Sequence, residues 1–121
     1  MKKYLVIGNP IEHSLSPKLH NYWIKKNNLD AVYNKKQPNE NDIEGIINEV
    51  KNGKIDGINV TVPFKKLVIP FLDKLTPLAK ETHSVNTIYK EKEHGVDVVI
   101  GDNTDVGGFE QSLEYIHYNV K

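Results

Sequence analysis

A lysine follows the apolar stretch Gly57–Thr61 at a spacing that could place it in a ligand site. In a strand, Asn59 and Thr61 would point to one face, because side chains alternate with a period of two. Pro63 then interrupts the strand, and Lys65 lies one helical turn beyond Thr61. Open α/β sheets bind ligands at the carboxyl ends of their strands, so these three polar side chains could bind and protonate a small molecule there. The alternative is a solvated Lys65, which is the usual state of lysine.

Two serines form a second candidate site, which is suited to an anion. Ser16 followed by Pro17 predicts a helix start, with Ser16 as the cap and Pro17 in the first helical position. The hydroxyls of Ser14 and Ser16, with the N–H groups of a helix N-terminus, could bind a carboxylate. All 16 basic residues are lysines, so an arginine fork cannot hold the anion. The alternative is that Ser16 only caps the helix and Ser14 is a loop residue.

Two further polar side chains accompany apolar runs. Asn86, in the run Val85–Tyr89, carries an amide that can donate and accept hydrogen bonds. Asp102 follows the run 96–100 after a single glycine, Gly101. Each also has a structural interpretation: Asn86 as a buried amide bonded to nearby backbone, and Asp102 with Asp105 as a turn and a helix cap. Taken singly, none of these clusters identifies a function.

A scaffold must bring these strand ends together. Apolar runs bounded by turn-forming residues predict strands at residues 4–8, 31–33, 57–61, 85–89 and 96–100. Helical patterns alternate with the first three strands, and the charged link 90–95 should close a hairpin between the last two. We therefore expect one α/β domain, a three-layer sandwich. Its mostly parallel sheet should contain an antiparallel strand and have helices on both faces.

Helix caps and apolar spacing predict the helices. Short helices are expected after Pro63 and after the cap-like pair Thr76-Pro77. Two longer helices, one from Ser16 and one from Asn39 to Asn52, should each bury one apolar face. The residues predicted to form the buried faces are Leu19, Tyr22 and Trp23 in the first of these helices and Ile43, Ile46, Ile47 and Val50 in the second. A final helix is marked by Phe109, Leu113 and Ile116.

Composition narrows the function further. The chain has 121 residues, no net charge and no cysteine, which argues against a general nucleic-acid or membrane-surface binder and against thiolate metal sites. The five histidines have no metal-ligand spacing with a third ligand, so no metal is expected. No Gly-x-Gly occurs, so the dinucleotide fingerprint is missing. No apolar run approaches a membrane span and the N-terminus lacks a signal-peptide pattern, so a cytoplasmic protein is expected.

Taken in order, four segments resemble the substrate-binding domain of shikimate dehydrogenase. They are GNPIEHSLSPKLHN, GINVTVPFK, SVNTI and GDNTDVGGFEQSL, and the similarity runs from Tyr4 to Leu113. The resemblance implies NADPH-dependent reduction of 3-dehydroshikimate to shikimate, a step toward chorismate and the aromatic amino acids. It also implies that NADP binds a C-terminal Rossmann domain of the same protein, so that residues 1–121 are a substrate-binding domain that is inactive alone. Two copies of the enzyme could pair as a homodimer.

The resemblance also assigns roles to residues of this chain. The family's two serines, here Ser14 and Ser16, bind the substrate carboxylate. Positions that bind ring hydroxyls match Asn59, Thr61 and Asn86. The pair at the reacting carbon matches Lys65 and Asp102. Whether Lys65 transfers the proton or mainly orients the substrate and stabilises charge stays open.

The chain departs from the family pattern at several positions. Glu12 stands where glycine is common and places a carboxylate near the serines. His83 and Ser84 replace Gly-Ala before Val-Asn-Thr, and His83 adds bulk near Asn86. Val106 replaces a glycine. Two alternatives to the main interpretation are a quinate/shikimate dehydrogenase domain and a stand-alone, non-catalytic binder of shikimate-like acids.

Overall fold

The computed structural model describes residues 2–10, 16–28 and 30–104. Several predictions lie outside the described residues, namely those for Ser14, Glu12, Asp105, Val106 and the helix around Phe109. The side chains of Ser16 and Leu19 also lie outside the description, although both residues belong to a described helix.

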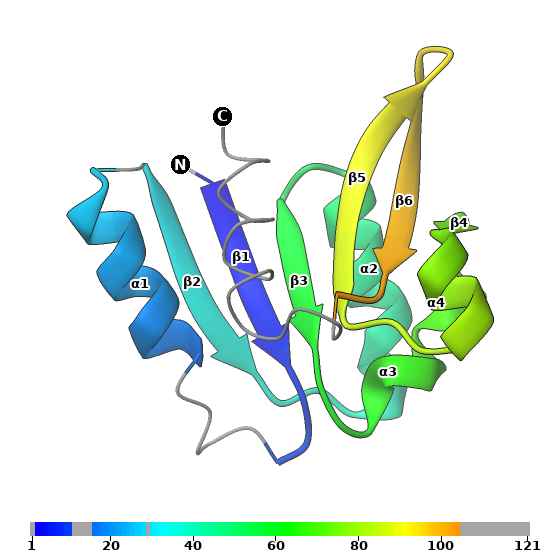
Figure 1. The fold of residues 1–121 in the computed structure, drawn as a ribbon, viewed down its shortest axis with the longest axis horizontal. Coiled ribbons are helices and arrows are strands. Elements are labelled where there is room, and N and C mark those ends of the chain that lie inside the picture. Colours follow the sequence, from blue (N-terminus) through cyan, green and yellow to red (C-terminus); the bar gives the residue numbers. More distant parts are fainter. Residues whose placement is uncertain (1, 11–15, 29, 105–121) are drawn as a thin grey trace.

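The described residues form one six-stranded sheet in the order β2-β1-β3-β5-β6-β4 (Figure 1). Its strands are β1 (Lys2–Ile7), β2 (Ala31–Lys36), β3 (Gly57–Val60), β4 (Lys74–Leu75), β5 (Thr87–Glu93) and β6 (Val96–Asp102). β1 runs parallel to both of its neighbours and β4 runs parallel to β6, whereas β5 is antiparallel to β3 and β6. The expected mostly parallel sheet with an antiparallel strand is confirmed. The two-residue β4 was not predicted, because it is too short to show an alternating pattern.

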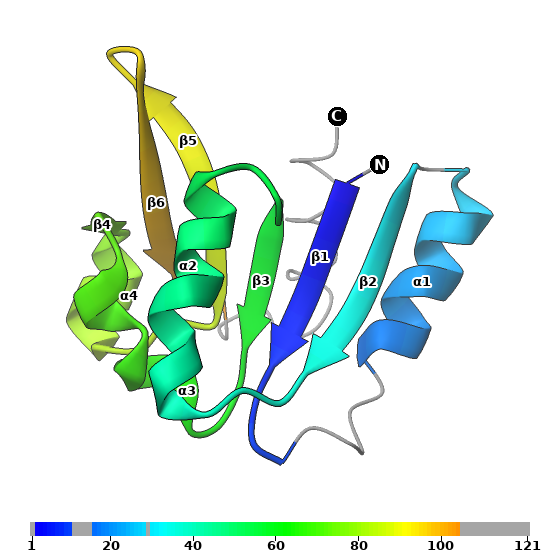
Figure 2. The same ribbon diagram turned by 180° about the vertical axis from the view of Figure 1, so that it is seen from behind.

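Helices cover both faces of this sheet, as the two opposite views show (Figures 1 and 2). On one face, α1 (Ser16–Lys26) packs beside β2 and β1. On the other lie α2 (Ile43–Lys51), α3 (Phe64–Leu67) and α4 (Pro77–Thr82). Short 3₁₀ turns, η1 (Glu40–Asp42) and η2 (Ile69–Phe71), precede α2 and follow α3. The three-layer sandwich is therefore confirmed.

The larger hydrophobic core lies between the sheet and α2. The four residues predicted for the apolar face of α2, which are Ile43, Ile46, Ile47 and Val50, are all buried there. They pack with sheet residues that include Ile7, Ile58, Ile88 and Val99. Complete burial of one such side chain stabilises the fold by about 1.5–3 kcal/mol. This core holds β3, β5 and β6 together, and these are the strands that carry the candidate site.

The prediction for the buried face of α1 was wrong at Tyr22, whose residue surface is 68% exposed. Among the side chains of α1 that the structure describes, His20 and Ile24 are the buried ones, at an i, i+4 spacing that puts both on one side of the helix. Ile24 packs with Tyr4, Val6 and Tyr33 in a second core cluster. The prediction assumed that the aromatic Tyr22 would be buried and did not consider the polar His20. In the structure Tyr22 is exposed and His20 faces the sheet.

Candidate functional site

Three strands bring their polar ends to one edge of the sheet. β3 and β6 end there, and the antiparallel β5 begins there (Figure 1). Asn59 on β3 pairs with Thr87 on β5, and Thr87 pairs with Asp102 on β6. Directly opposed residues of neighbouring strands share a face, so Asn59, Thr87 and Asp102 form a row across one face of the sheet. The helix α1 begins at the same end of the sheet, about level with the arrowheads of β1 and β2 in both views (Figures 1 and 2).

The segment Val85–Asn86 ties Lys65 and Asn86 to this row. The Val85 amide donates to the Lys65 carbonyl at 2.8 Å, and the Asn86 amide donates to the Asp102 carbonyl at 2.9 Å. The Asn86 carbonyl accepts from the Val60 amide at 2.8 Å. Two consecutive residues thus fix the backbones of Lys65 and Asp102 relative to each other, although the two lie far apart in the sequence.

Gly101 allows the chain to approach closely behind Asp102. A Cβ atom at Gly101 would lie 2.5 Å from Leu72 Cδ1 and 2.9 Å from Val85 Cγ2. Separations this short are clashes, and the side chains of Leu72 and Val85 or the strand itself would have to shift to relieve them. The glycine of the Gly-Asp-Asn-Thr segment therefore lets the side chains of Leu72 and Val85 pack directly against β6.

The side chain of Asn86 is held by its oxygen. Asn86 Oδ1 accepts from the Thr104 amide at 2.9 Å, from Thr104 Oγ1 at 3.0 Å and from Thr87 Oγ1 at 3.0 Å. Thr87 and Thr104 are themselves buried. The amide orientation follows, because the oxygen faces these donors and the NH₂ group must face the opposite way.

The carboxylate of Asp102 is also oriented through one oxygen. Oδ1 accepts from Thr76 Oγ1 at 2.6 Å and from the Asn103 amide at 2.7 Å. Within the described part of the chain, Oδ2 receives no hydrogen bond. Asp102 is half-buried, and a ligand at the sheet end would meet a carboxylate whose plane is already fixed. The predicted turn at Asp102 is present as well, in its bond to the amide of the next residue.

Asn59 is oriented by Tyr33, a residue that was not predicted as part of the site. The Tyr33 hydroxyl donates to Asn59 Oδ1 at 2.7 Å. The Asn59 amide nitrogen lies 3.5 Å from the Asn86 carbonyl oxygen and 3.4 Å from Thr87 Oγ1. Asn59 and Asn86 therefore belong to one connected polar network.

Thr61 and Lys65 lie just past the end of β3. The Thr61 amide donates to the Ile7 carbonyl at 2.9 Å, and its carbonyl accepts from the Phe64 amide at 3.0 Å. Phe64 is 1% exposed and anchors the four-residue helix α3. Lys65 is half-buried on this helix, while its neighbour Lys66 is exposed. The two neighbouring lysines thus differ in burial, and the candidate Lys65 is the less exposed of them.

Of the positions that depart from the family pattern, His83 and Ser84 lie among the described residues. His83 is exposed and ends α4 with a left-handed φ of 52°. A glycine adopts that conformation without steric cost, so the substitution places strain in the backbone at this helix end.

Burial controls the protonation of two aromatic residues behind Asn59. His20 is 2% exposed, and its ring stacks on Tyr33 with 4.1 Å between centroids and 4° between planes. Burial lowers the pKa of His20 from 6.5 to about 4 and raises the pKa of Tyr33 well above its usual value. Near neutral pH the imidazole is therefore uncharged, and Tyr33 keeps its hydroxyl proton.

The site contains more residues than the sequence patterns revealed. Tyr33 was seen only as part of a strand, and Thr76 only as a helix cap. Thr87 and Thr104 belong to the segments SVNTI and GDNTDVGGFEQSL, but neither was assigned a role in the site. Thr87 lies opposite Asn59 in the sheet. The strand pairing, once known, would therefore have placed Thr87 on the same face as Asn59.

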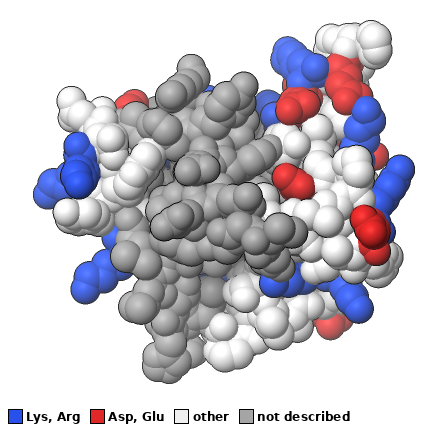
Figure 3. All heavy atoms as spheres, viewed as in Figure 1, with Lys and Arg blue, Asp and Glu red and all other residues white. Residues whose placement is uncertain are grey.

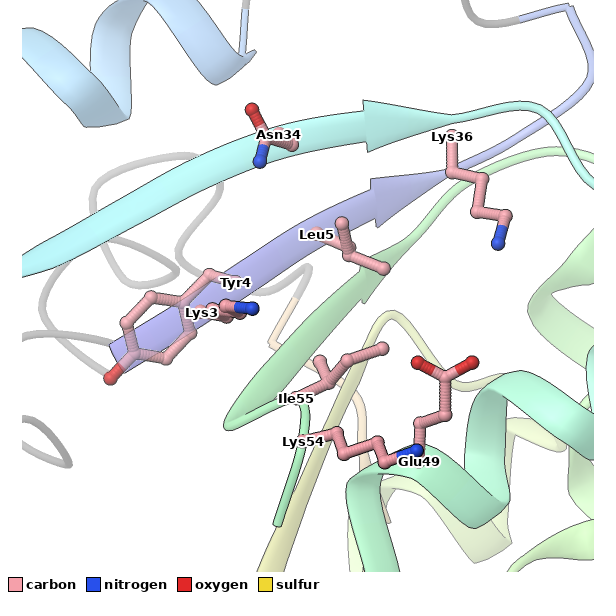
Figure 4. Close-up of a pocket in the computed structure, with 8 residues that line it drawn as sticks. All are labelled: Lys3, Tyr4, Leu5, Asn34, Lys36, Glu49, Lys54 and Ile55. Carbon is pink, nitrogen blue, oxygen red and sulfur yellow. The ribbon is translucent and has the colours of Figure 1, made fainter. Parts of the chain in front are cut away.

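A separate open pocket of about 510 Å³ lies on the other face of the sheet (Figure 4). Leu5 and Ile55 form its apolar lining, and three lysines and Glu49 surround them. The lysines are Lys3, Lys36 and Lys54. None of the predicted site residues lines this pocket.

Charges of both signs are interspersed around the hairpin β5–β6 on the face shown in Figure 3. Among the described residues, no three His, Asp or Glu side chains are grouped so that they could hold a metal ion. Over the same residues, every helix is too short or too polar to cross a membrane.

Comparison with known proteins identifies the family. Residues 6–88 match the family model described as "Shikimate dehydrogenase substrate binding domain". A shikimate dehydrogenase (NADP(+)) of Pelagibacter ubique is 55% identical over 120 residues, which are 99% of this chain and 44% of that protein. The chain thus spans less than half the length of this curated relative.

Solved structures agree with this match. Shikimate dehydrogenase from Aquifex aeolicus has a TM-score of 0.78 and 41% identity, over 96% of this chain and 42% of that one. Shikimate 5-dehydrogenase from Thermus thermophilus, solved in complex with shikimate, has a TM-score of 0.78 and 30% identity, over 95% of this chain and 42% of that one. The chain therefore belongs to the family of shikimate dehydrogenase substrate-binding domains.

Proposed function

We propose that this chain is the substrate-binding half of an NADP-dependent shikimate dehydrogenase, which reversibly reduces 3-dehydroshikimate to shikimate in the route to chorismate. The observation that carries the proposal is the row of Asn59, Thr87 and Asp102, with Asn86 and Lys65 tied to it by backbone hydrogen bonds. The shikimate in the Thermus thermophilus structure and the NADP(+) in the name of the Pelagibacter ubique relative support the ligand and the cofactor.

The substrate-binding roles follow from the orientation of the amides. Asn59 and Asn86 are held by their oxygens, so each meets a ring hydroxyl as a hydrogen-bond donor. Thr61 offers a hydroxyl beside them. Ser14 and Ser16 bind the substrate carboxylate at the start of α1, where the helix N-terminus favours an anion.

Lys65 and Asp102 act at the reacting carbon. NADP, when bound, supplies or accepts the hydride at that carbon. Lys65 donates a proton to the carbonyl oxygen during reduction and takes it back during oxidation, from a distance of about 2.6–3.2 Å. Asp102, held through Oδ1, orients the same hydroxyl with Oδ2. Lys65 can also stabilise the negative charge that develops on the oxygen, which is a separate contribution.

The nicotinamide cofactor belongs on a C-terminal Rossmann domain of the same protein. This chain contains no Gly-x-Gly, so it lacks the turn that brings a backbone against a pyrophosphate. The chain alone should therefore bind substrate without oxidising it. We place the whole enzyme in the cytoplasm, and we propose a homodimer as its oligomeric state.

An assay of the complete enzyme tests this proposal. Shikimate and quinate are each supplied with NADP or NAD, and cofactor reduction is followed. We expect the highest kcat/KM with shikimate and NADP. A preference for quinate would instead assign a quinate/shikimate dehydrogenase. Binding of shikimate without turnover under any cofactor would indicate a non-catalytic binder.

A further inference from the structure

Tyr33 reaches the candidate site from a strand that does not border it. Tyr33 on β2 lies opposite Tyr4 on β1, and Val6 on β1 lies opposite Asn59 on β3. The ring of Tyr33 therefore extends past β1 to place its hydroxyl 2.7 Å from Asn59 Oδ1. Tyr33 is 1% exposed, so this contact is made inside the protein.

Tyr33 is held both at its ring and at its backbone. His20 on α1 stacks on it face to face, with 4.1 Å between ring centroids. Asn21, the next residue of α1, binds the Tyr33 backbone twice: its Oδ1 accepts from the Tyr33 amide at 2.8 Å, and its Nδ2 donates to the Tyr33 carbonyl at 2.6 Å. These contacts leave the hydroxyl little freedom to move away from Asn59.

The contacts of Asn59 determine which way its amide faces. The Asn86 carbonyl can only accept a hydrogen bond, so the group of Asn59 that lies beside it must be the NH₂. The oxygen then faces Tyr33, whose hydroxyl proton is retained near neutral pH. Removal of the Tyr33 hydroxyl would take away the donor that holds this oxygen in place.

We infer that Tyr33 is a positioning residue for substrate recognition: its hydroxyl holds the Asn59 oxygen and so turns the NH₂ toward Asn86 and Thr87 in the candidate site. On that side Asn59 can bind a ring hydroxyl only as a donor, with the hydroxyl oxygen as acceptor. This inference rests on the proposed function, in which Asn59 binds a ring hydroxyl. A site that pairs a ring hydroxyl discriminates against an analogue that lacks it, because its own polar group is then left without a partner. Tyr33 would thereby determine specificity without touching the substrate.

The test replaces the hydroxyl alone, in the variant Tyr33→Phe. Tyr4→Phe is the matched control, because Tyr4 is the cross-strand partner of Tyr33, is 3% exposed, and within the described part of the chain makes no hydrogen bond through its hydroxyl. The first measurement records the side-chain amide NMR signals of Asn59 in the ligand-free 121-residue chain. We expect Tyr33→Phe to change their shifts and their contacts with Thr87, and Tyr4→Phe to leave them in place.

The second measurement uses the complete enzyme with shikimate and with analogues that each lack one non-reacting ring hydroxyl. In Tyr33→Phe we expect KM for shikimate to rise about three- to tenfold, as for the loss of one neutral hydrogen bond, with kcat nearly unchanged. KM should not change for the analogue that lacks the ring hydroxyl bound by Asn59. The preference of the enzyme for shikimate over this analogue should therefore fall by the same factor. If Tyr33 had a purely structural role, Tyr33→Phe would raise KM for shikimate and for every analogue by the same factor.

The two measurements separate this inference from the proposed function. Unchanged Asn59 signals in Tyr33→Phe, or an equal loss for shikimate and every analogue, would overturn the inference. If the unmodified enzyme failed to use shikimate, the proposed function would fail and with it the substrate part of the inference. The amide signals would still report whether Tyr33 orients Asn59.

Discussion

Thr76 and Asp102 connect the start of α4 to the end of β6 through a hydrogen bond of 2.6 Å between Thr76 Oγ1 and Asp102 Oδ1. The same hydroxyl oxygen accepts from the Ala79 amide at 3.4 Å and so caps α4. One side chain therefore stabilises a helix start and orients the carboxylate that we assign to the reacting carbon.

Replacing Thr76 by valine should destabilise the domain, because it removes both hydrogen bonds and keeps the shape. We expect the free energy of unfolding to fall by about 1–3 kcal/mol, from a lost cap and a lost bond to a carboxylate. Denaturant unfolding of the two proteins measures the difference. Thr76→Ser is the control, since serine keeps the hydroxyl and should lose less than half as much. Equal stability of Thr76→Val and wild type would show that neither bond contributes.

His20 should make stability depend on pH. Its pKa is about 4 in the folded protein and 6.5 when unperturbed, so between these values the unfolded chain binds a proton that the folded chain does not. Stability should therefore be unaffected by His20 above pH 6.5 and fall as pH drops toward 4, by a total on the order of 3 kcal/mol.

A His20→Phe variant isolates this effect from the carboxylates that titrate in the same range, because it keeps an aromatic ring against Tyr33. The difference in unfolding free energy between the two proteins is plotted from about pH 7.5 to about pH 4. We expect it to change steadily below pH 6.5. A difference that stays constant over the whole range would show that His20 takes up its proton equally in both states.

His83→Gly should stabilise the domain. His83 adopts φ 52° at the end of α4, where a side chain with a Cβ is strained and glycine is not. We expect a gain of about 0.5–1 kcal/mol in unfolding free energy, read from thermal or denaturant melts. His83→Ala keeps the Cβ and should show no gain. If alanine stabilised as much as glycine, the imidazole and not the backbone would be the source of strain.

Lys65→Ala should remove catalysis from the complete enzyme. A positioned acid–base group contributes at least about 10²-fold, so kcat should fall by that factor or more. Lys66→Ala is the matched control, because Lys66 is the exposed neighbour on the same helix, and its kinetics should stay close to wild type. An increase confined to KM in Lys65→Ala would show that Lys65 binds substrate without taking part in the proton transfer.

The sequence predicted the fold where a local pattern decides the structure. The spacing of Ile43, Ile46, Ile47 and Val50 identified the buried face of α2, and Thr76-Pro77 identified the cap of α4. The prediction for α1 was wrong at Tyr22 because tertiary contacts decide which side chains are buried: the sheet buries His20 through its stack on Tyr33 and leaves Tyr22 exposed.

For the site, the sequence pointed to the residues but not to what orients them. Asn59, Asn86 and Asp102 were identified as candidates, and the structure brings them together at one sheet end. Tyr33 and Thr76 could not be predicted as their partners, since the pairs are 26 residues apart in each case. Contacts over such separations depend on strand order and register, which local patterns do not specify.

Titration of the 121-residue chain with shikimate tests the central claim most directly, with backbone and side-chain amide signals followed by NMR. Because half of the active site would lie on the second domain, we expect weak binding, near a dissociation constant of about 1 mM, or about −4 kcal/mol. The account predicts saturable shifts at Ser14, Ser16, Thr61, Lys65, Asn86 and Asp102. Saturable shifts elsewhere, or no shifts at these residues both in this chain and in the complete enzyme, would contradict it.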